Sequence, residues 1–192
     1  MKLVIGISGK AQHGKDTIAT YLQSRLGGSI VHFTDLLKEQ AQYLGWDGTK
    51  DIGGRTFLQT LSEPIRKYGN WLAEKYPEYR DFSGGNYYSA SLYNAILEGE
   101  SDIYYIADMR MMQEYKFFLD KGNEGKIKFI TLRVDRLEEG APFDNGLTPS
   151  QKLDKTETEL DTTQMDYHII NDGDISALET NLEGIVKDLC EL

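Results

Sequence analysis

The stretch Leu3–Thr17 reads Leu-Val-Ile-Gly-Ile-Ser-Gly-Lys-Ala-Gln-His-Gly-Lys-Asp-Thr. Its first part, Leu3–Ser8, is apolar enough to form a strand that is covered on both faces. Gly9–Lys15 then has the Gly-x-x-x-x-Gly-Lys spacing of a phosphate-binding loop. Apolar residues recur at helical spacing from Ile18 onward. A buried strand, a glycine-rich loop and an amphipathic helix in this order predict a site for the phosphates of a nucleotide.

The chemistry of this loop follows from its residue types. Glycines permit backbone conformations that turn successive N–H groups onto phosphate oxygens, and the following helix adds its positive dipole end. Lys15 is expected to reach the β- and γ-phosphates. A glycine-rich turn with a chance lysine is the alternative, and the strand–loop–helix context argues against it. The phosphate-binding candidates are Gly9, Lys10, Ala11, His13, Gly14, Lys15, Asp16 and Thr17.

Position 16 departs from the usual pattern, which has a magnesium-binding Ser or Thr there. Either Asp16 holds magnesium or the neighbouring Thr17 supplies the hydroxyl, and the sequence leaves both open. A GTPase is not indicated. The fifth predicted strand runs into Asn171-Asp172-Gly173-Asp174, which lacks the lysine of a guanine-reading Asn-Lys-x-Asp motif.

The rest of the chain alternates strand and helix. The predicted strands are Leu3–Ser8, Ile30–Phe33, Ile103–Ala107, Ile127–Leu132 and Tyr167–Ile170. Parallel pairing through right-handed crossovers predicts an α/β protein, a three-layer α/β/α P-loop kinase fold with a five-stranded parallel sheet. We expect one domain over 1–192. Ligands of such sheets lie at the carboxyl ends of the strands.

Two segments interrupt this alternation. Residues 45–100 predict a helical insertion for the acceptor, with a loop over 47–54 and a helix from Thr56 to about Lys75 that Pro64 and Gly69 divide. Residues 135–160 predict a lid, because 135–150 are polar and rich in glycine and proline. The last helix is expected to begin with a capping box of Ser176 and Glu179.

Several cations are candidates for the chemistry of phosphoryl transfer, which depends on positioning and charge neutralisation. Asp108 ends the third strand, where a carboxylate could hold magnesium, and Arg110 follows it and could grip an acceptor phosphate. An Asp–Arg surface pair is the alternative. Further acceptor-binding candidates are Lys38 and Arg66, and the lid candidates for the transferred phosphoryl are Arg133 and Arg136.

Composition restricts the kinds of molecule that this protein is expected to bind. The net charge of −10 argues against non-specific binding to nucleic acid or an anionic membrane. No apolar stretch approaches the length that spans a bilayer. The single cysteine, Cys190, cannot form an internal disulfide, which suits the cytoplasm. The oligomeric state stays open, a homodimer included.

Taken together, these features resemble the deoxynucleoside monophosphate kinases of bacteriophages, within the adenylate-kinase-like group. The similar segments extend over most of the chain. They are Ser8–Thr17, Phe33–Glu39, Arg55–Leu61 with Ile65-Arg66, Ile106–Arg110, Thr156–Asp161 and Asp166–Gly173. Asp directly after the loop lysine is usual in that family.

The resemblance implies ATP and Mg²⁺ on the donor side and a deoxynucleoside monophosphate as the acceptor. It places Arg110, with Lys38 and Arg66, around the acceptor phosphate. Animal phosphomevalonate kinases look similar in the Gly-Lys-Asp loop and the Glu-x-x-Leu-Asp segment. Two alternatives therefore stay open: a kinase of another phosphorylated metabolite, such as phosphomevalonate, and a non-catalytic ATP-binding module.

Overall fold

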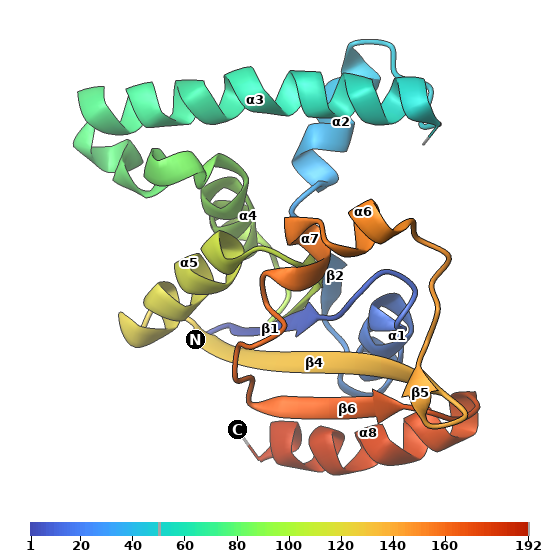
Figure 1. Cartoon of the computed structure of the whole chain (residues 1–192). Coiled ribbons are helices and arrows are strands. Elements are labelled where there is room, and N and C mark those ends of the chain that lie inside the picture. Colours follow the sequence, from blue (N-terminus) through green and yellow to red (C-terminus); the bar gives the residue numbers. More distant parts are fainter. Residues whose placement is uncertain (50, 192) are drawn as a thin grey trace. The chain divides into compact units, whose positions relative to one another are not determined.

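The computed structural model describes residues 1–49 and 51–191. Its internal contacts divide the chain into two compact units, shown in sequence colours in Figure 1. We call Met1–Val31 with Glu100–Leu192 the sheet unit, and His32–Gly99 the helical unit. The helical unit therefore starts before the predicted insertion of 45–100, because it includes the helix that follows the second strand.

The sheet unit is built on five parallel strands. They are β1 (Leu3–Ser8), β2 (Ser29–Val31), β3 (Ile103–Met109), β4 (Lys128–Glu138) and β6 (Tyr167–Asn171). Their order is β2-β3-β1-β4-β6, with every neighbouring pair parallel. A two-residue strand, β5 (Ala141–Pro142), pairs antiparallel with the end of β4. The predicted α/β class with a five-stranded parallel sheet is confirmed.

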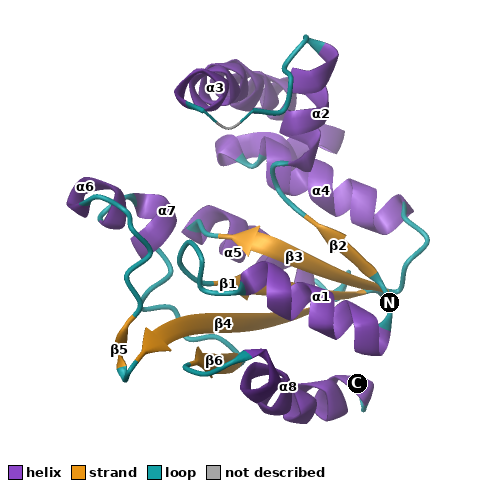
Figure 2. Cartoon of the chain, turned by 90° about the vertical axis from the view of Figure 1, so that its right-hand side faces the viewer, coloured by secondary structure: helices purple, strands orange, loops and turns teal. Residues whose placement is uncertain are grey.

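Helices cover both faces of this sheet (Figure 2). The helices of the sheet unit are α1 (Lys15–Leu26), α5 (Met112–Asn123), α6 (Pro149–Lys152), α7 (Lys155–Thr158) and α8 (Ile175–Cys190). On one face, Ile5 and Ile7 share a buried cluster with Leu22 of α1 and Leu182 of α8. Burying such side chains stabilises the fold by about 1.5–3 kcal/mol each. The sheet is thus a rigid base for whatever its strand ends carry.

The helical unit consists of α2 (Asp35–Tyr43), α3 (Ile52–Lys75), the 3₁₀ segment η1 (Pro77–Gly85) and α4 (Tyr87–Glu98). Helix α3 is continuous, so the predicted division at Pro64 and Gly69 is wrong. Pro64 lies on an exposed face together with Thr60, whose carbonyl loses its helical donor and can be hydrated there. Gly69 serves packing, since a Cβ there would lie 3.2 Å from the Phe82 carbonyl oxygen.

Three predicted boundaries are also wrong. Helix α3 begins at Ile52, inside the loop predicted over 47–54, because the Asp51 side chain accepts the Gly54 N–H at 2.7 Å and caps the helix. Position 50 of that loop lies outside the described residues. Strand β4 continues to Glu138 because β6 pairs with it as far as Arg136 and β5 pairs with its last two residues. Helix α8 is capped by Asp174, which accepts the Ala177 N–H, and not by Ser176.

Within residues 1–49 and 51–191, no helix combines the length and the hydropathy that a membrane span requires.

Candidate active site

The phosphate-binding loop joins β1 to α1 at the carboxyl end of the sheet. Gly9 has φ 151°, and a Cβ at this position would lie 2.5 Å from the Val134 carbonyl oxygen, so glycine is required twice over. Gly14 has φ 105° at the start of α1. Only glycine adopts such backbone freely, which explains the two glycines of the motif. The loop folds as its sequence predicts.

Lys15 is buried at the first position of α1. Its ammonium donates to the carbonyl oxygens of Gly9 and Lys10, both at 2.8 Å. Burial and the nearby charge of Arg110 lower the pKa of Lys15 to about 8, although Glu157, Asp16 and Asp108 act in the opposite direction. The ammonium is thus held inside the loop, and the nearby carboxylates balance its positive charge only in part. This is expected of a group that binds an anion.

The metal candidates lie close to this lysine. The carboxylates of Asp16 and Asp108 both act electrostatically on Lys15. Asp16 and Thr17 are exposed on the first turn of α1, and Asp108 is half-buried near the end of β3. Mg²⁺ is usually held by one or two carboxylates together with substrate phosphates and water. The residues present fit that requirement, while the choice between Asp16 and Thr17 stays a prediction.

Arg110 faces the loop through a bridging carboxylate. Its guanidinium donates to Oε1 of Glu157 at 2.7 Å. The other carboxylate oxygen, Oε2, accepts the backbone N–H of Ala11 at 2.9 Å. Only 6% of the Glu157 side chain is exposed. One buried anion therefore spans the gap between a loop N–H and the arginine that sequence analysis assigned to the acceptor.

The segment that carries Glu157 is tied to the loop at a second point. Asn145 is buried, and its side-chain amide donates to the Ala11 carbonyl oxygen at 3.4 Å. The backbone carbonyl oxygen of Asn145 accepts a hydrogen bond from the Gln12 side chain at 3.2 Å. The predicted lid, 135–160, thus holds the loop through Asn145 as well as Glu157. Helix α6 lies between these two contacts, and α7 carries Glu157.

His13 forms the far side of the loop and is buried. Its ring Nδ1 accepts the backbone N–H of Arg136 at 3.1 Å, and its carbonyl oxygen accepts from the Asn171 side chain at 3.1 Å. These contacts tie the loop to the ends of β4 and β6. His13 thus ties the loop to the sheet, and its part in phosphate binding stays a prediction.

Arg133 lies in β4, where two carboxylates hold it. Its guanidinium donates to both oxygens of Asp135, at 2.9 and 3.0 Å, and to Asp161 at 2.8 Å. Asp161 also pairs with Lys10 of the loop at 3.2 Å. Burial opposes the ionisation of Asp135, but contacts with His13, Arg133 and His168 outweigh it and hold its pKa well below the usual range. Arg133 is thus the centre of an ion-pair network that braces the loop.

Arg136 differs from Arg133 in being exposed. Its guanidinium lies 4.1 Å from the centre of the Phe143 ring, and it donates weakly to the Gln12 carbonyl oxygen at 3.5 Å. Few contacts oppose its movement. Of the two predicted lid cations, Arg136 is the one whose charge is not already balanced by a pair of carboxylates among the described residues.

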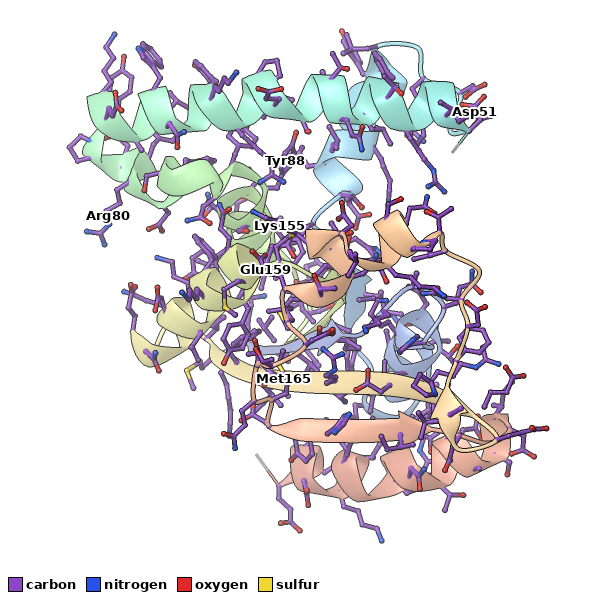
Figure 3. All side chains as sticks on the ribbon, viewed as in Figure 1. Asp51, Arg80, Tyr88, Lys155, Glu159 and Met165 are labelled. Carbon is purple, nitrogen blue, oxygen red and sulfur yellow. The ribbon has the colours of Figure 1, made fainter. Side chains whose placement is uncertain are left out.

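The remaining acceptor candidates belong to the helical unit. Lys38 on α2 pairs with Asp35 at 3.5 Å. Arg66 on α3 donates to the Gly85 carbonyl oxygen at 3.0 Å and lies over the Tyr88 ring, which is labelled in Figure 3. Both side chains have local partners within their own unit, and their assignment to the acceptor stays a prediction.

Sequence reasoning assigned no role to Glu157, Asn145 or Asp161, although it identified the segments that hold them. A signal was present at Glu157, which lies three residues before Leu160 in a polar stretch. Both residues are buried, so this turn packs inward. Burial of a carboxylate requires a cationic or N–H partner, and the loop and Arg110 supply both.

No family model matches the sequence. Among solved structures, the chain is similar to the APS kinase CysC of Mycobacterium tuberculosis in complex with AMPPNP and APS, with 12% identity, a TM-score of 0.50, and coverage of 97% of this chain and 98% of that one. TT1252 from Thermus thermophilus is similar with 20% identity, a TM-score of 0.50 and 98% coverage of both chains. The chain has a P-loop kinase fold. At these identities, the likeness shows the fold alone.

Proposed function

We propose that this protein is an ATP-dependent kinase that transfers the γ-phosphoryl group to a deoxynucleoside monophosphate. The donor half of the proposal rests on the loop, in which Gly9 and Gly14 have the required backbone conformation and Lys15 is buried with its ammonium inside the loop. The related fold of an APS kinase bound to AMPPNP supports the same half.

The observation that carries the proposal is the position of Arg110. Its guanidinium and the Ala11 N–H of the loop bind the two oxygens of a single carboxylate, at 2.7 and 2.9 Å. A cation therefore faces the donor loop across the width of one anion. Such an arginine neutralises charge where donor and acceptor phosphates approach each other, which is the main requirement for transfer between two anions.

The reaction requires positioning more than acid–base chemistry. The loop N–H groups and Lys15 would hold the donor phosphates, and Arg110 would hold the incoming phosphate oxygen in line with the γ-phosphorus. A phosphate oxygen is already ionised at neutral pH, so no strong general base is needed. Magnesium, held by Asp108 with Asp16 or Thr17, would add positive charge over the β- and γ-phosphates.

A nucleotide acceptor is further supported by a groove in the helical unit. Apolar side chains of α2 and α3, among them Leu36, Leu61 and Ile65, line a space of about 460 Å³. Gln40 also lines it, and its buried Oε1 has no hydrogen-bond partner among the residues that the structure describes. An apolar groove with one unused acceptor suits a flat heterocycle that carries an N–H donor.

A panel assay tests the proposal. ADP formation is measured with ATP and magnesium in the presence of each deoxynucleoside monophosphate, phosphomevalonate, or no acceptor. We expect turnover that depends on at least one deoxynucleoside monophosphate. Stimulation by phosphomevalonate alone would identify the other metabolite kinase, and ATP binding without turnover would identify a binding module. Either result would refute the proposed acceptor.

A further inference from the structure

The carboxylate of Glu157 is bound as a phosphate would be. Each of its oxygens has its own anion-binding partner, the Ala11 N–H of the loop at 2.9 Å and the Arg110 guanidinium at 2.7 Å. Its charge also acts on the buried ammonium of Lys15. The three groups that surround it are a loop N–H, an arginine and a lysine, the same kinds of group that bind phosphoryl oxygens.

A carboxylate that only balanced the charge of Arg110 would not need a hydrogen bond from a backbone N–H of the loop. Arg133 offers a comparison, because Asp135 and Asp161 bind its guanidinium. These two carboxylates meet the loop through the side chains of His13 and Lys10, whereas Glu157 accepts a hydrogen bond from a loop backbone N–H. Glu157 instead divides its two oxygens between the donor loop and Arg110. It therefore lies between the donor loop and Arg110, where the proposed transfer would place the phosphoryl group.

Two anions cannot share this place. The Glu157 side chain is almost fully buried, and like charges a few ångströms apart in a poorly hydrated site repel each other strongly. A terminal phosphoryl held by Lys15 and the Ala11 N–H would compete with Glu157 for that N–H. Binding of the nucleoside triphosphate thus requires Glu157 to move.

We propose that Glu157 is a built-in competitor for the terminal phosphoryl of the nucleotide, so that the γ-phosphate displaces it from Ala11 and Arg110 and thereby frees Arg110 for the acceptor. This inference rests on the proposed function, because it assumes that the loop binds a nucleoside triphosphate. In this scheme Glu157 sets the order of binding. The nucleotide binds first, and Arg110 becomes available to the acceptor afterwards.

The test compares nucleotide affinities of three full-length proteins by calorimetry, without an acceptor. Glu157→Gln keeps the size of the side chain but removes its charge. Glu159→Gln is the matched control, because Glu159 lies on the same segment and accepts a backbone N–H, from Met112 at 2.8 Å, away from the loop (Figure 3). We expect Glu157→Gln to bind ATP about tenfold tighter, the value of one charge-assisted hydrogen bond no longer in competition.

The sign of the effect separates this role from a structural one. If Glu157 merely braces the loop, Glu157→Gln binds ATP as the wild type does or more weakly, and the competitor is refuted. An equal gain for ATP and ADP would refute its assignment to the terminal phosphoryl. Tighter binding in Glu159→Gln as well would show a general loosening of the segment, which also refutes the proposal.

These affinities, together with turnover in the panel assay, keep the two proposals apart. If neither nucleotide binds any of the three proteins, the donor half of the proposed function fails and the competitor fails with it. If ATP binding tightens as expected but no deoxynucleoside monophosphate supports turnover, the acceptor is wrong and the competitor stands. If a deoxynucleoside monophosphate supports turnover but Glu157→Gln leaves the ATP affinity unchanged, the acceptor is right and the competitor is refuted.

A second measurement leaves Glu157 in place. Lys155, labelled in Figure 3, is exposed on α7 two residues before Glu157. Cys190 is exposed and can be replaced. An environment-sensitive dye on Lys155→Cys in a Cys190→Ala background reports movement of α7. ATP is expected to change its emission at the concentrations that saturate binding, whereas an unchanged emission at saturation would overturn the displacement.

Discussion

The core of the sheet unit and helix α3 of the helical unit bury their apolar side chains very differently. In the sheet unit, Ile5, Leu22 and Leu182 are inaccessible to solvent within one cluster. In α3, all of whose 24 residues are described, the buried positions are the glycines Gly54 and Gly69. The contrast indicates that the donor loop is fixed by a packed core, whereas α3 relies on partial burial along its length. The buried apolar side chains of the helical unit lie on its other elements, as Leu92 and Ile96 do on α4.

The exposed aromatic side chains of the helical unit show the same contrast. Tyr68 is 53% exposed and Trp71 45% exposed, and their rings stack with centroids 5.4 Å apart. Regions with few buried apolar contacts open at low free-energy cost and are the ones that adapt to ligands. The proposed chemistry lies in the sheet unit, and α3 is the element of the helical unit best able to adapt to the proposed acceptor.

The largest expected effect is on the donor loop. Lys15→Ala removes the buried ammonium that neutralises the leaving phosphates, and we expect turnover to fall by about 10²–10³-fold. Lys126→Ala, an exposed lysine of the same unit, is the control and should retain full activity. A small effect of Lys15→Ala on steady-state turnover would break the assignment of catalysis to the sheet unit.

A matched pair of core truncations tests the contrast in packing. Leu22→Ala opens a cavity in the sheet unit and should lower the free energy of unfolding by about 3 kcal/mol. Leu61→Ala in α3 removes a half-buried side chain that lines the groove and should cost about 1 kcal/mol. Urea denaturation followed by circular dichroism measures both. Equal losses of unfolding free energy in the two variants would contradict the difference in packing between the core of the sheet unit and α3.

Arg110→Ala should weaken the use of the acceptor while leaving the donor bound. We expect the KM for the acceptor to rise about 10–30-fold, the cost of one bidentate charge-assisted contact. Initial rates at saturating ATP give this value. Arg80→Ala, whose side chain is exposed on η1 (Figure 3), should leave the acceptor KM unchanged. Unchanged acceptor kinetics in Arg110→Ala would show that this arginine is structural.

The smallest effect concerns the network behind the loop. The pKa of Asp135 is lower in the folded protein than its value of about 3.9 in an unfolded chain, so its charge stabilises the fold above about pH 4 and this stabilisation is lost as the pH falls further. Asp135→Asn should cost about 1 kcal/mol at pH 7 and flatten the decline towards pH 3. Urea unfolding at pH 7, 5 and 3 checks this. Parallel pH profiles would contradict the role of Asp135.

Sequence predicted the sheet unit far better than the helical unit, for a physical reason. Strands buried on both faces give continuous apolar runs, and the loop has glycines that its backbone angles require, so both appear as local patterns. Helix α3 misled the prediction because the proline rule is local, whereas water can satisfy the Thr60 carbonyl at an exposed face.

The candidate site was predicted in part, for the same reason. Lys15 and Arg110 follow from motif and strand end, and the structure brings both to Glu157. The contacts of Glu157 and Asn145 with the loop were missed, because both residues lie far from the loop in sequence and their burial depends on how the lid folds. The ion pairs of Arg133 were equally hidden, since Asp161 reaches it from another segment.

The loop is synthesised well before the residues that hold it in place. Its residues Ala11 and His13 bond to Asn145 and Asn171, which follow 134 and 158 residues later in the chain. Closing such long loops costs entropy before any contact repays it, so these bonds form late in folding. A nascent chain that ends before residue 145 thus has the nucleotide motif without its braces. The ability to bind nucleotide should appear only once the final strand and the lid have emerged, as one of the last events of folding.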